Sequence, residues 1–123
     1  MLGRCDVIAF VATTSPGRAR AFYAGTLGLA VIADEPFALV LDANGVTLRV
    51  AKVPALAPAP HTVLGWRVSD IHTTVELLRD EGVVFERYDG LAQDETGVWT
   101  SPGGARVAWF KDPDGNVLSL TQP

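Results

Sequence analysis

The sequence repeats a pattern at a spacing of about half its length, and this internal repeat limits the possible folds more than any other feature. A shift of 55 positions aligns residues 7–23 with residues 62–78, so that apolar stretches coincide and Ser15 matches Asp70. Both residue types favour the position before a helix, because their side-chain oxygens accept hydrogen bonds from its free backbone N–H groups. Each half therefore predicts a strand followed by a helix.

The end of each half carries a second repeated segment. Residues 42–50, DANGVTLRV, match residues 112–120, DPDGNVLSL, after a shift of 70 positions. The difference between the two shifts predicts an insertion of 15 residues in the second half, which we assign to the loop around Asp94 and Glu95. The chain is therefore predicted to contain two tandem modules of the same design.

Further strands follow the helix in each module. Ser15 with Pro16 predicts the start of the first helix and Asp70 that of the second, and a glycine ends each helix. Apolar stretches predict strands at 7–12, 29–33, 37–42 and 45–51 in the first half. They predict strands at 63–68, 83–88, 98–101, 106–111 and 116–121 in the second half. Three prolines within residues 53–60 favour an extended linker between the modules.

The sequence DPDG, residues 112–115, has a residue suited to each corner of a turn. Asp112 can accept backbone hydrogen bonds, Pro113 fixes the first corner dihedral, and Gly115 allows the positive dihedral that follows. The acidic residues also suggest a cation site, but so short a segment offers too few oxygen ligands for calcium. We interpret the segment as a hairpin turn.

Composition narrows the function classes. The chain of 123 residues is 48% hydrophobic and carries a formal net charge of -4, and its basic residues form no run. We therefore exclude nucleic acid as a partner. The single Cys5 excludes an internal disulfide. The apolar stretch after Asp6 is too short for a signal peptide or a membrane span, so we expect a cytoplasmic protein without a membrane partner.

Several segments together resemble a known family. FYAGTLGL in the first helix, VSDI at the second helix start and the terminal KDPDGNVLSLTQ are similar to the vicinal oxygen chelate (VOC) superfamily, which includes glyoxalase, bleomycin-resistance and extradiol-dioxygenase proteins. The resemblance implies the α+β glyoxalase/bleomycin resistance fold, in which two tandem βαβββ modules form a cupped mixed sheet. It implies a single VOC domain over residues 1–123, with modules at about 1–52 and 61–123 and the Pro-rich linker at 53–60.

In metal-dependent members, as the resemblance implies, the first and last strands of each module supply the metal ligands. The matching positions here are Ile8, Arg49, Val63 and Ser119. Isoleucine and valine have no lone pair, a guanidinium repels a cation, and a neutral hydroxyl is a weak ligand. We therefore expect no metal and no other cofactor.

Two polar residues, Asp6 and His61, precede these first-strand positions by two residues and match each other across the repeat. Because strands expose the same face at every second residue, they are candidates for a polar catalytic centre. Their positions at strand entrances also allow a simpler interpretation as surface polar residues. His72, in the first turn of the second helix, is interpreted as a solvated residue.

The strand positions that share a face with the ligand-equivalent residues predict a binding surface with an apolar floor and two guanidinium groups. It consists of Ile8, Phe10, Thr47, Arg49, Val63, Arg67, Val117 and Ser119. Trp99, Trp109 and Phe110 are close enough in the second module to add stacking surface. Alternatively, Trp66 and Trp109 face the helices and fill the core.

A surface of this composition suits a flat or apolar organic molecule with an anionic edge. Arg49 is expected either to orient that edge or to have a structural role, in which it forms an ion pair with Asp6 or Glu95 or reaches solvent past the sheet edge. The sequence thus favours a metal-free small-molecule-binding protein of the bleomycin-resistance type. A glyoxalase-like lyase, isomerase or dioxygenase acting on a small organic substrate is the alternative. We also expect a homodimer, because related folds pair or exchange modules across a two-fold axis.

Overall fold

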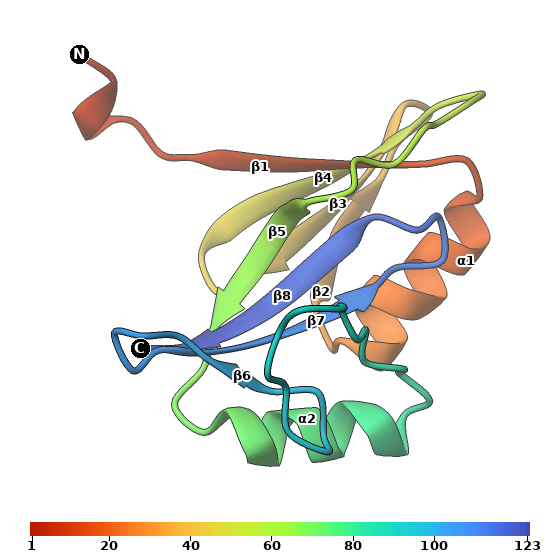
Figure 1. Cartoon of the computed structure of the whole chain (residues 1–123). Coiled ribbons are helices and arrows are strands. Elements are labelled where there is room, and N and C mark those ends of the chain that lie inside the picture. Colours follow the sequence, from red (N-terminus) through yellow and green to blue (C-terminus); the bar gives the residue numbers. More distant parts are fainter. The chain divides into compact units, whose positions relative to one another are not determined.

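The computed structural model describes all residues from 1 to 123 and divides into two compact units, residues 1–57 and 58–123. The first unit contains η1 (Leu2–Arg4), β1 (Ile8–Thr13), α1 (Pro16–Arg20), η2 (Ala21–Thr26), β2 (Ala30–Asp34), β3 (Ala38–Ala43) and β4 (Val46–Lys52). The second unit contains β5 (Thr62–Arg67), α2 (Ile71–Asp80), β6 (Trp99–Thr100), β7 (Arg106–Lys111) and β8 (Val117–Gln122) (Figure 1). The predicted α+β fold with a βαβββ order in each half is confirmed.

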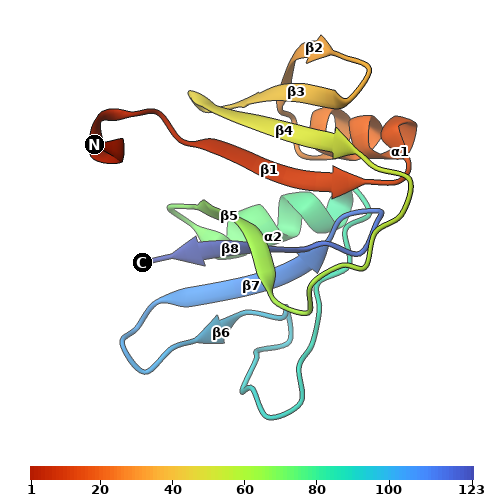
Figure 2. The same ribbon diagram turned by 90° about the horizontal axis from the view of Figure 1, so that it is seen from above.

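The two sheets have the same mixed topology. The strand order is β1-β4-β3-β2 in the first sheet and β5-β8-β7-β6 in the second, so the first and last strands of each module are neighbours (Figure 2). These neighbours, β1 with β4 and β5 with β8, are parallel, whereas the remaining pairs are antiparallel. The sequence repeat is therefore a repeat of complete sheets, and equivalent residues can be compared through their strand registers.

The first helical segment and one face of the first sheet form the core of the first unit. Ala19 and Tyr23 from the helical segment are inaccessible, as are Leu41 of β3 and Leu48 and Val50 of β4. The residues between them on β4 are more accessible, as the alternation of side chains along a strand requires. The apolar stripe predicted for the helix therefore supplies this core.

The first helix changes type partway along its length. The π-helix η2 continues α1, and the Leu27 N–H donates to the Phe22 carbonyl at 2.9 Å. Gly25 lies in this wide turn, where its low helix propensity makes a departure from α-helical geometry less costly. Ser15 precedes the helix as predicted, but its side chain forms no capping hydrogen bond. Instead, the Thr13 hydroxyl accepts the Ser15 N–H at 3.0 Å.

The second helix begins at the predicted cap. Asp70 accepts hydrogen bonds from the Thr73 N–H at 3.2 Å and the Thr73 hydroxyl at 2.9 Å, and these bonds lower the pKa of Asp70. Gln122 at the end of β8 accepts the Ile71 N–H at 2.9 Å, which ties the helix start to the sheet. Ile71 and Val75 are buried where α2 packs against β7 and β8. None of the helices is long and apolar enough to cross a membrane.

Residues 83–88 do not form the predicted strand. Phe85 makes an isolated bridge to Phe110, and the Glu86 N–H donates to the Trp109 carbonyl at 2.8 Å. The first two residues of β7 pair with β6 instead. Because β6 and this segment divide one edge of β7 between them, neither has room to pair along its full length.

The turn of the first unit is a tight hairpin. Asn44 and Gly45 have positive φ angles of 52° and 91°, and they alone separate β3 from β4. Two consecutive residues with positive φ are typical of a two-residue turn that matches the twist of its strands. Asp42 accepts the Gly45 N–H at 2.9 Å.

The turn of the second unit is held from within by a buried aspartate. Asp112 Oδ1 accepts the N–H groups of Asp114 at 3.0 Å and Asn116 at 2.9 Å, and Oδ2 accepts the Asn116 amide at 2.8 Å. Gly115 has a φ of 88°, and its N–H donates to the Asp112 carbonyl at 3.0 Å. The predicted roles of Asp112 and Gly115 are confirmed.

Candidate functional site

The face of the second sheet opposite its core carries the principal candidate site, and we call it the second outer face. Phe110 is inaccessible in the core, so its neighbour Trp109 points to the other side together with its cross-strand partner Ser119. Trp99 pairs with Val107, which lies two residues from Trp109 on the same strand. Both tryptophans therefore belong to the second outer face.

Three aromatic rings meet there and form what we call the aromatic cluster: Tyr88, Trp99 and Trp109. The centroid of the Trp109 ring lies 5.4 Å from that of Tyr88, with the ring planes at 86°. It lies 6.1 Å from the centroid of Trp99, with the planes at 37°. All three side chains are partly accessible. Rings in such arrangements stabilise one another, while their accessible faces can still contact a flat molecule.

The long loop before β6 positions the outer two rings, and Gln93 is its main hydrogen-bonding residue. The Gln93 amide donates to the carbonyls of Glu86 at 2.9 Å and Gly97 at 2.8 Å, and it accepts the Tyr88 N–H at 2.7 Å. A backbone bridge joins Gln93 to Trp99. One side chain thus connects the segments that carry Tyr88 and Trp99.

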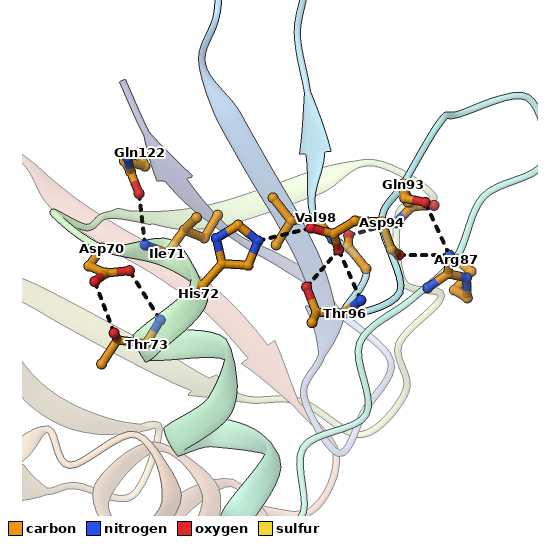
Figure 3. A network of polar contacts seen from close by, with 11 residues as sticks. Asp70, Ile71, His72, Thr73, Arg87, Gln93, Asp94, Thr96, Val98 and Gln122 are labelled. Carbon is orange, nitrogen blue, oxygen red and sulfur yellow. Dashed lines mark hydrogen bonds and ion pairs between the residues drawn. The ribbon is translucent and has the colours of Figure 1, made fainter.

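Asp94 fastens the same loop to α2, as Figure 3 shows. Its Oδ2 lies 2.9 Å from His72 Nε2, and its Oδ1 accepts the Thr96 hydroxyl at 2.6 Å and the Val98 N–H at 3.0 Å. Burial raises the pKa of Asp94, but the hydrogen bonds that its carboxylate accepts, first of all from His72, outweigh this effect and hold the pKa well below its usual range. His72 therefore links α2 to this loop through its hydrogen bond with Asp94. Its interpretation as a merely solvated residue was incomplete.

The predicted positions on β8 are buried, whereas those on β5 are exposed. Val117 and Ser119 are 4% and 7% exposed. Gly65 pairs with Ser119, and a Cβ atom at Gly65 would lie 2.7 Å from Ser119 Oγ, so the glycine leaves the space that this hydroxyl occupies. Arg67 is exposed on the same face. Val63 is 40% exposed at an irregularity in the β5 register, where strict alternation fails.

Phe110 does not belong to the second outer face, which corrects the expectation that it adds stacking surface for a ligand. Its ring lies in the core, with its centroid 5.5 Å from Phe85 and 6.4 Å from Trp66. Adjacent residues of a strand face opposite sides, so Trp109 and Phe110 cannot line one surface. Trp66 lies on the core face of its sheet, near Phe110, whereas Trp109 lies on the outer face, and both side chains are partly accessible.

Two residues of the second outer face, Tyr88 and Lys111, escaped the sequence analysis. Lys111 pairs with Val117 and lies two residues from Trp109, so strand alternation was sufficient to find it. Tyr88 lies beyond the isolated bridge of Phe85, where no strand period applies. An aromatic residue beside a long insertion was the only signal for it.

The corresponding face of the first sheet, which we call the first outer face, carries four predicted residues. Ile8 pairs with Thr47, and Phe10 pairs with Arg49. Ile8 and Phe10 are 51% and 60% exposed. Arg49 Nη2 lies 3.4 Å from Glu35 Oε2, so its carboxylate partner follows β2 and is neither of the two that the sequence suggested. The guanidinium is not held in an apolar environment without a counter-charge.

The two weak catalytic candidates, Asp6 and His61, are exposed just before the first strand of their respective units. His61 Nδ1 lies 3.1 Å from the carbonyl oxygen of its neighbour Thr62. Neither unit contains a group of three or more His, Cys, Asp or Glu side chains that could hold a metal ion. Of the positions that the resemblance assigns to metal ligands, Ile8 and Val63 have no donor atoms, so the residues present do not fit a divalent cation.

A comparison with sequence families identifies the class of this protein. The sequence profile of the Glyoxalase/Bleomycin resistance protein/Dioxygenase superfamily matches residues 4–120. The chain therefore belongs to this superfamily, as its motifs predicted. No curated protein matches the sequence.

Solved structures share the fold at low sequence identity. Lactoylglutathione lyase from Agrobacterium tumefaciens superposes with a TM-score of 0.73 at 13% identity, over 96% of this chain and 93% of that one. TnmS3, an antibiotic-binding protein from Streptomyces sp. CB03234, gives 0.70 at 24% identity, over 98% of each chain. A superfamily member from Sphaerobacter thermophilus gives 0.72 at 22% identity, over 95% of this chain and 97% of that one. The fold thus occurs in both an enzyme and a binding protein.

Proposed function

We propose that the chain is a metal-free small-molecule-binding protein of the bleomycin-resistance type, which holds an aromatic or apolar organic ligand. The observation that carries the proposal is the aromatic cluster of Tyr88, Trp99 and Trp109 on the second outer face. Ligand sites commonly combine aromatic walls with a few polar groups, and Arg67 supplies an exposed guanidinium on the same face, where the Ser119 hydroxyl is largely buried. A flat ligand gains the most from such rings, because stacking requires parallel or offset surfaces.

The cluster is also well prepared for binding. The hydrogen bonds of Gln93 and Asp94 fix the loop that carries Tyr88 and leads into Trp99. A ligand therefore does not have to order this loop, and less of its contact energy is lost to conformational entropy.

The similar structures support two candidate activities. TnmS3 is described as an antibiotic-binding protein, which agrees with a binding function. Lactoylglutathione lyase represents the alternative, a glyoxalase-like lyase, isomerase or dioxygenase that acts on a small organic substrate. The side chains at Ile8 and Val63 argue against the metal-dependent form of that alternative, because neither can ligate a cation.

The test is a mutant pair that separates the outer face from the core. A library of aromatic fragments is screened, and calorimetry then compares the best ligand on wild type, Trp99→Leu and the control Trp66→Phe. Loss of the Trp99 ring is expected to weaken binding about tenfold. The control changes a tryptophan on the opposite face of the sheet and is expected to bind within about twofold of wild type. Equal affinity of wild type and Trp99→Leu would contradict the proposal.

We also propose that the chain forms a homodimer. β1 is an edge strand of the first sheet, and it carries the exposed apolar side chains of Ile8 and Phe10. Natural proteins cover such edges and patches, commonly with a second copy. Light scattering is expected to give twice the chain mass of 13.1 kDa, and a value equal to the chain mass at micromolar concentration contradicts this proposal.

A further inference from the structure

A second feature lies beside the aromatic cluster, a cavity of about 420 Å³ within the second unit. Its walls are residues 58–60 of the Pro-rich segment together with Tyr88, Lys111, Gly115 and Val117. The volume lies within the usual range for small-molecule sites. Lys111 and Val117 are cross-strand partners, and Tyr88 packs on Trp109, so the cavity adjoins the second outer face.

The turn between β7 and β8 holds one wall of this cavity in place. A Cβ atom at Gly115 would lie 3.4 Å from Pro58 Cγ, so the proline rests directly against the turn. The turn is itself fixed by the buried side chain of Asp112, which accepts three hydrogen bonds. The Pro-rich segment is therefore positioned as a wall on its side of the cavity.

Lys111 is the only charged residue that lines the cavity. Its Nζ lies 3.3 Å from Glu86 Oε1, and its side chain remains 49% exposed. An ammonium group has three N–H donors, so Lys111 can keep the contact with Glu86 and donate to a second acceptor as well. Burial raises the pKa of Tyr88, and the charge of Glu86 adds to this effect while that of Lys111 opposes it. A phenol is protonated at neutral pH even without such a shift, so Tyr88 is a hydrogen-bond donor.

We propose that this cavity binds the carboxylate of an aromatic acid, with Lys111 Nζ as the group that pairs with it. This inference rests on the proposed function and adds the chemical class of the ligand. The prolines, Tyr88 and Val117 contact the apolar body of the acid, which extends toward Trp109. Lys111 can bridge the Glu86 carboxylate and one ligand carboxylate through separate N–H groups, whereas a doubly charged phosphate would place still more negative charge beside Glu86. The anionic end of the ligand is assigned to Lys111 because this residue lines the cavity, whereas Arg49 belongs to the first unit.

The experiment compares an acid with a neutral molecule of the same shape. Calorimetry measures the Kd of 2-naphthoate and of 2-naphthylmethanol for wild type, Lys111→Met, Lys111→Arg and the control Lys52→Met. Lys52 also pairs with a carboxylate, that of Asp34 at 2.6 Å, but it lies in the first unit. Lys111→Met is expected to weaken 2-naphthoate at least about tenfold and to leave 2-naphthylmethanol within about twofold. Lys111→Arg and Lys52→Met are expected to retain the affinity for 2-naphthoate.

The outcomes separate this inference from the proposed function. Equal affinity of wild type and Lys111→Met for 2-naphthoate overturns the role of Lys111, while the proposed function stands if Trp99→Leu still weakens binding. A parallel loss for the acid and the alcohol also overturns it, because the charge then has no selective effect. Failure of wild type to bind 2-naphthoate overturns the inference as well. If the screen of aromatic fragments also yields no ligand at all, both the inference about Lys111 and the proposed function are contradicted.

Discussion

The two outer faces have the same strand order and different side-chain chemistry. In the second sheet Trp109 is the cross-strand partner of Ser119. The equivalent pair in the first sheet is Val40 and Arg49. Around Arg49 the first unit has an ion pair with Glu35, whereas around Trp109 the second unit has two further aromatic rings. The repeat therefore specifies strand order and register, and the residues that alternate away from the core are free to differ.

The inserted loop accounts for much of this difference. β2 has five residues and pairs along β3, but β6 has only two, so the edge of β7 is left for the segment that leads to Tyr88. Gln93 then holds Tyr88 and Trp99 in one network. A short edge strand thus allows the loop to place an aromatic ring over Trp109.

The largest expected effect is the loss of stability when a core residue is truncated. It tests whether the two cores are equivalent although the outer faces differ. Leu41 pairs with Leu48 as Phe110 pairs with Leu118, and all four side chains are inaccessible. Phe110→Ala is expected to lower the free energy of unfolding by about 3–5 kcal/mol, and Leu41→Ala by about 2–5 kcal/mol, because each leaves a cavity. Urea unfolding measures both. A loss below about 1 kcal/mol for either variant would contradict a shared core design.

The next effect separates the two repeated turns. Asp112 is buried and accepts three hydrogen bonds, whereas Asp42 is more accessible and accepts one from Gly45. Asp112→Ala is expected to cost about 2 kcal/mol and Asp42→Ala about 0.5–1 kcal/mol, because unsatisfied buried donors are left only in the second turn. The same urea experiment provides the comparison. Equal losses would show that burial of the aspartate has no effect on its contribution.

The smallest effect concerns the contact of the inserted loop with α2, which has no counterpart in the first unit. The pKa of Asp94 in the folded chain lies below its ordinary value of 3.8, so the contribution of this carboxylate to stability is present above that pH and is lost as the pH falls below it. Because the His72–Asp94 pair is exposed, the contribution is expected to stay below about 1 kcal/mol.

The measurement is urea unfolding of wild type and Asp94→Asn between neutral and acidic pH. Wild type is expected to be the more stable protein at neutral pH, and the difference is expected to shrink as the pH falls below the ordinary value of Asp94. Asp42→Asn is the matched control, because its carboxylate accepts a backbone N–H in the first unit. A difference that grows in acid would mean that the sign of the linkage is wrong.

Much of the fold was predictable because it depends on local patterns. Each copy of the repeated strand-helix pattern, like the cap at Asp70, can be recognised from neighbouring residues alone. The strand β7 likewise has the predicted limits of 106 and 111. The prediction of a strand at residues 83–88 was wrong because this segment competes with β6 for one edge of β7, and such competition cannot be read from neighbouring residues. Strand propensity cannot say which of two segments pairs first with β7.

The candidate site was predictable where strand alternation applies. Ser119 lies on the outer face, as alternation along its strand indicated, whereas Phe110 was assigned to that face against the alternation rule. Trp99 also lies there, but its face was left open by the sequence. Contacts between distant segments were missed: Glu35 with Arg49 and His72 with Asp94 each join residues far apart in the sequence. Only the folded backbone brings such pairs together.

The most direct test of the central claim observes the three tryptophans of the wild type at once. Each indole N–H gives its own signal in a nitrogen-15 correlation spectrum, and 2-naphthoate or the best library fragment is added stepwise. The signals of Trp99 and Trp109 are expected to shift with a common saturation curve, while that of Trp66, on the opposite face of the sheet, changes little. A saturable shift of Trp66 alone, or binding without any change at Trp99 and Trp109, would contradict the assignment of the ligand to the second outer face.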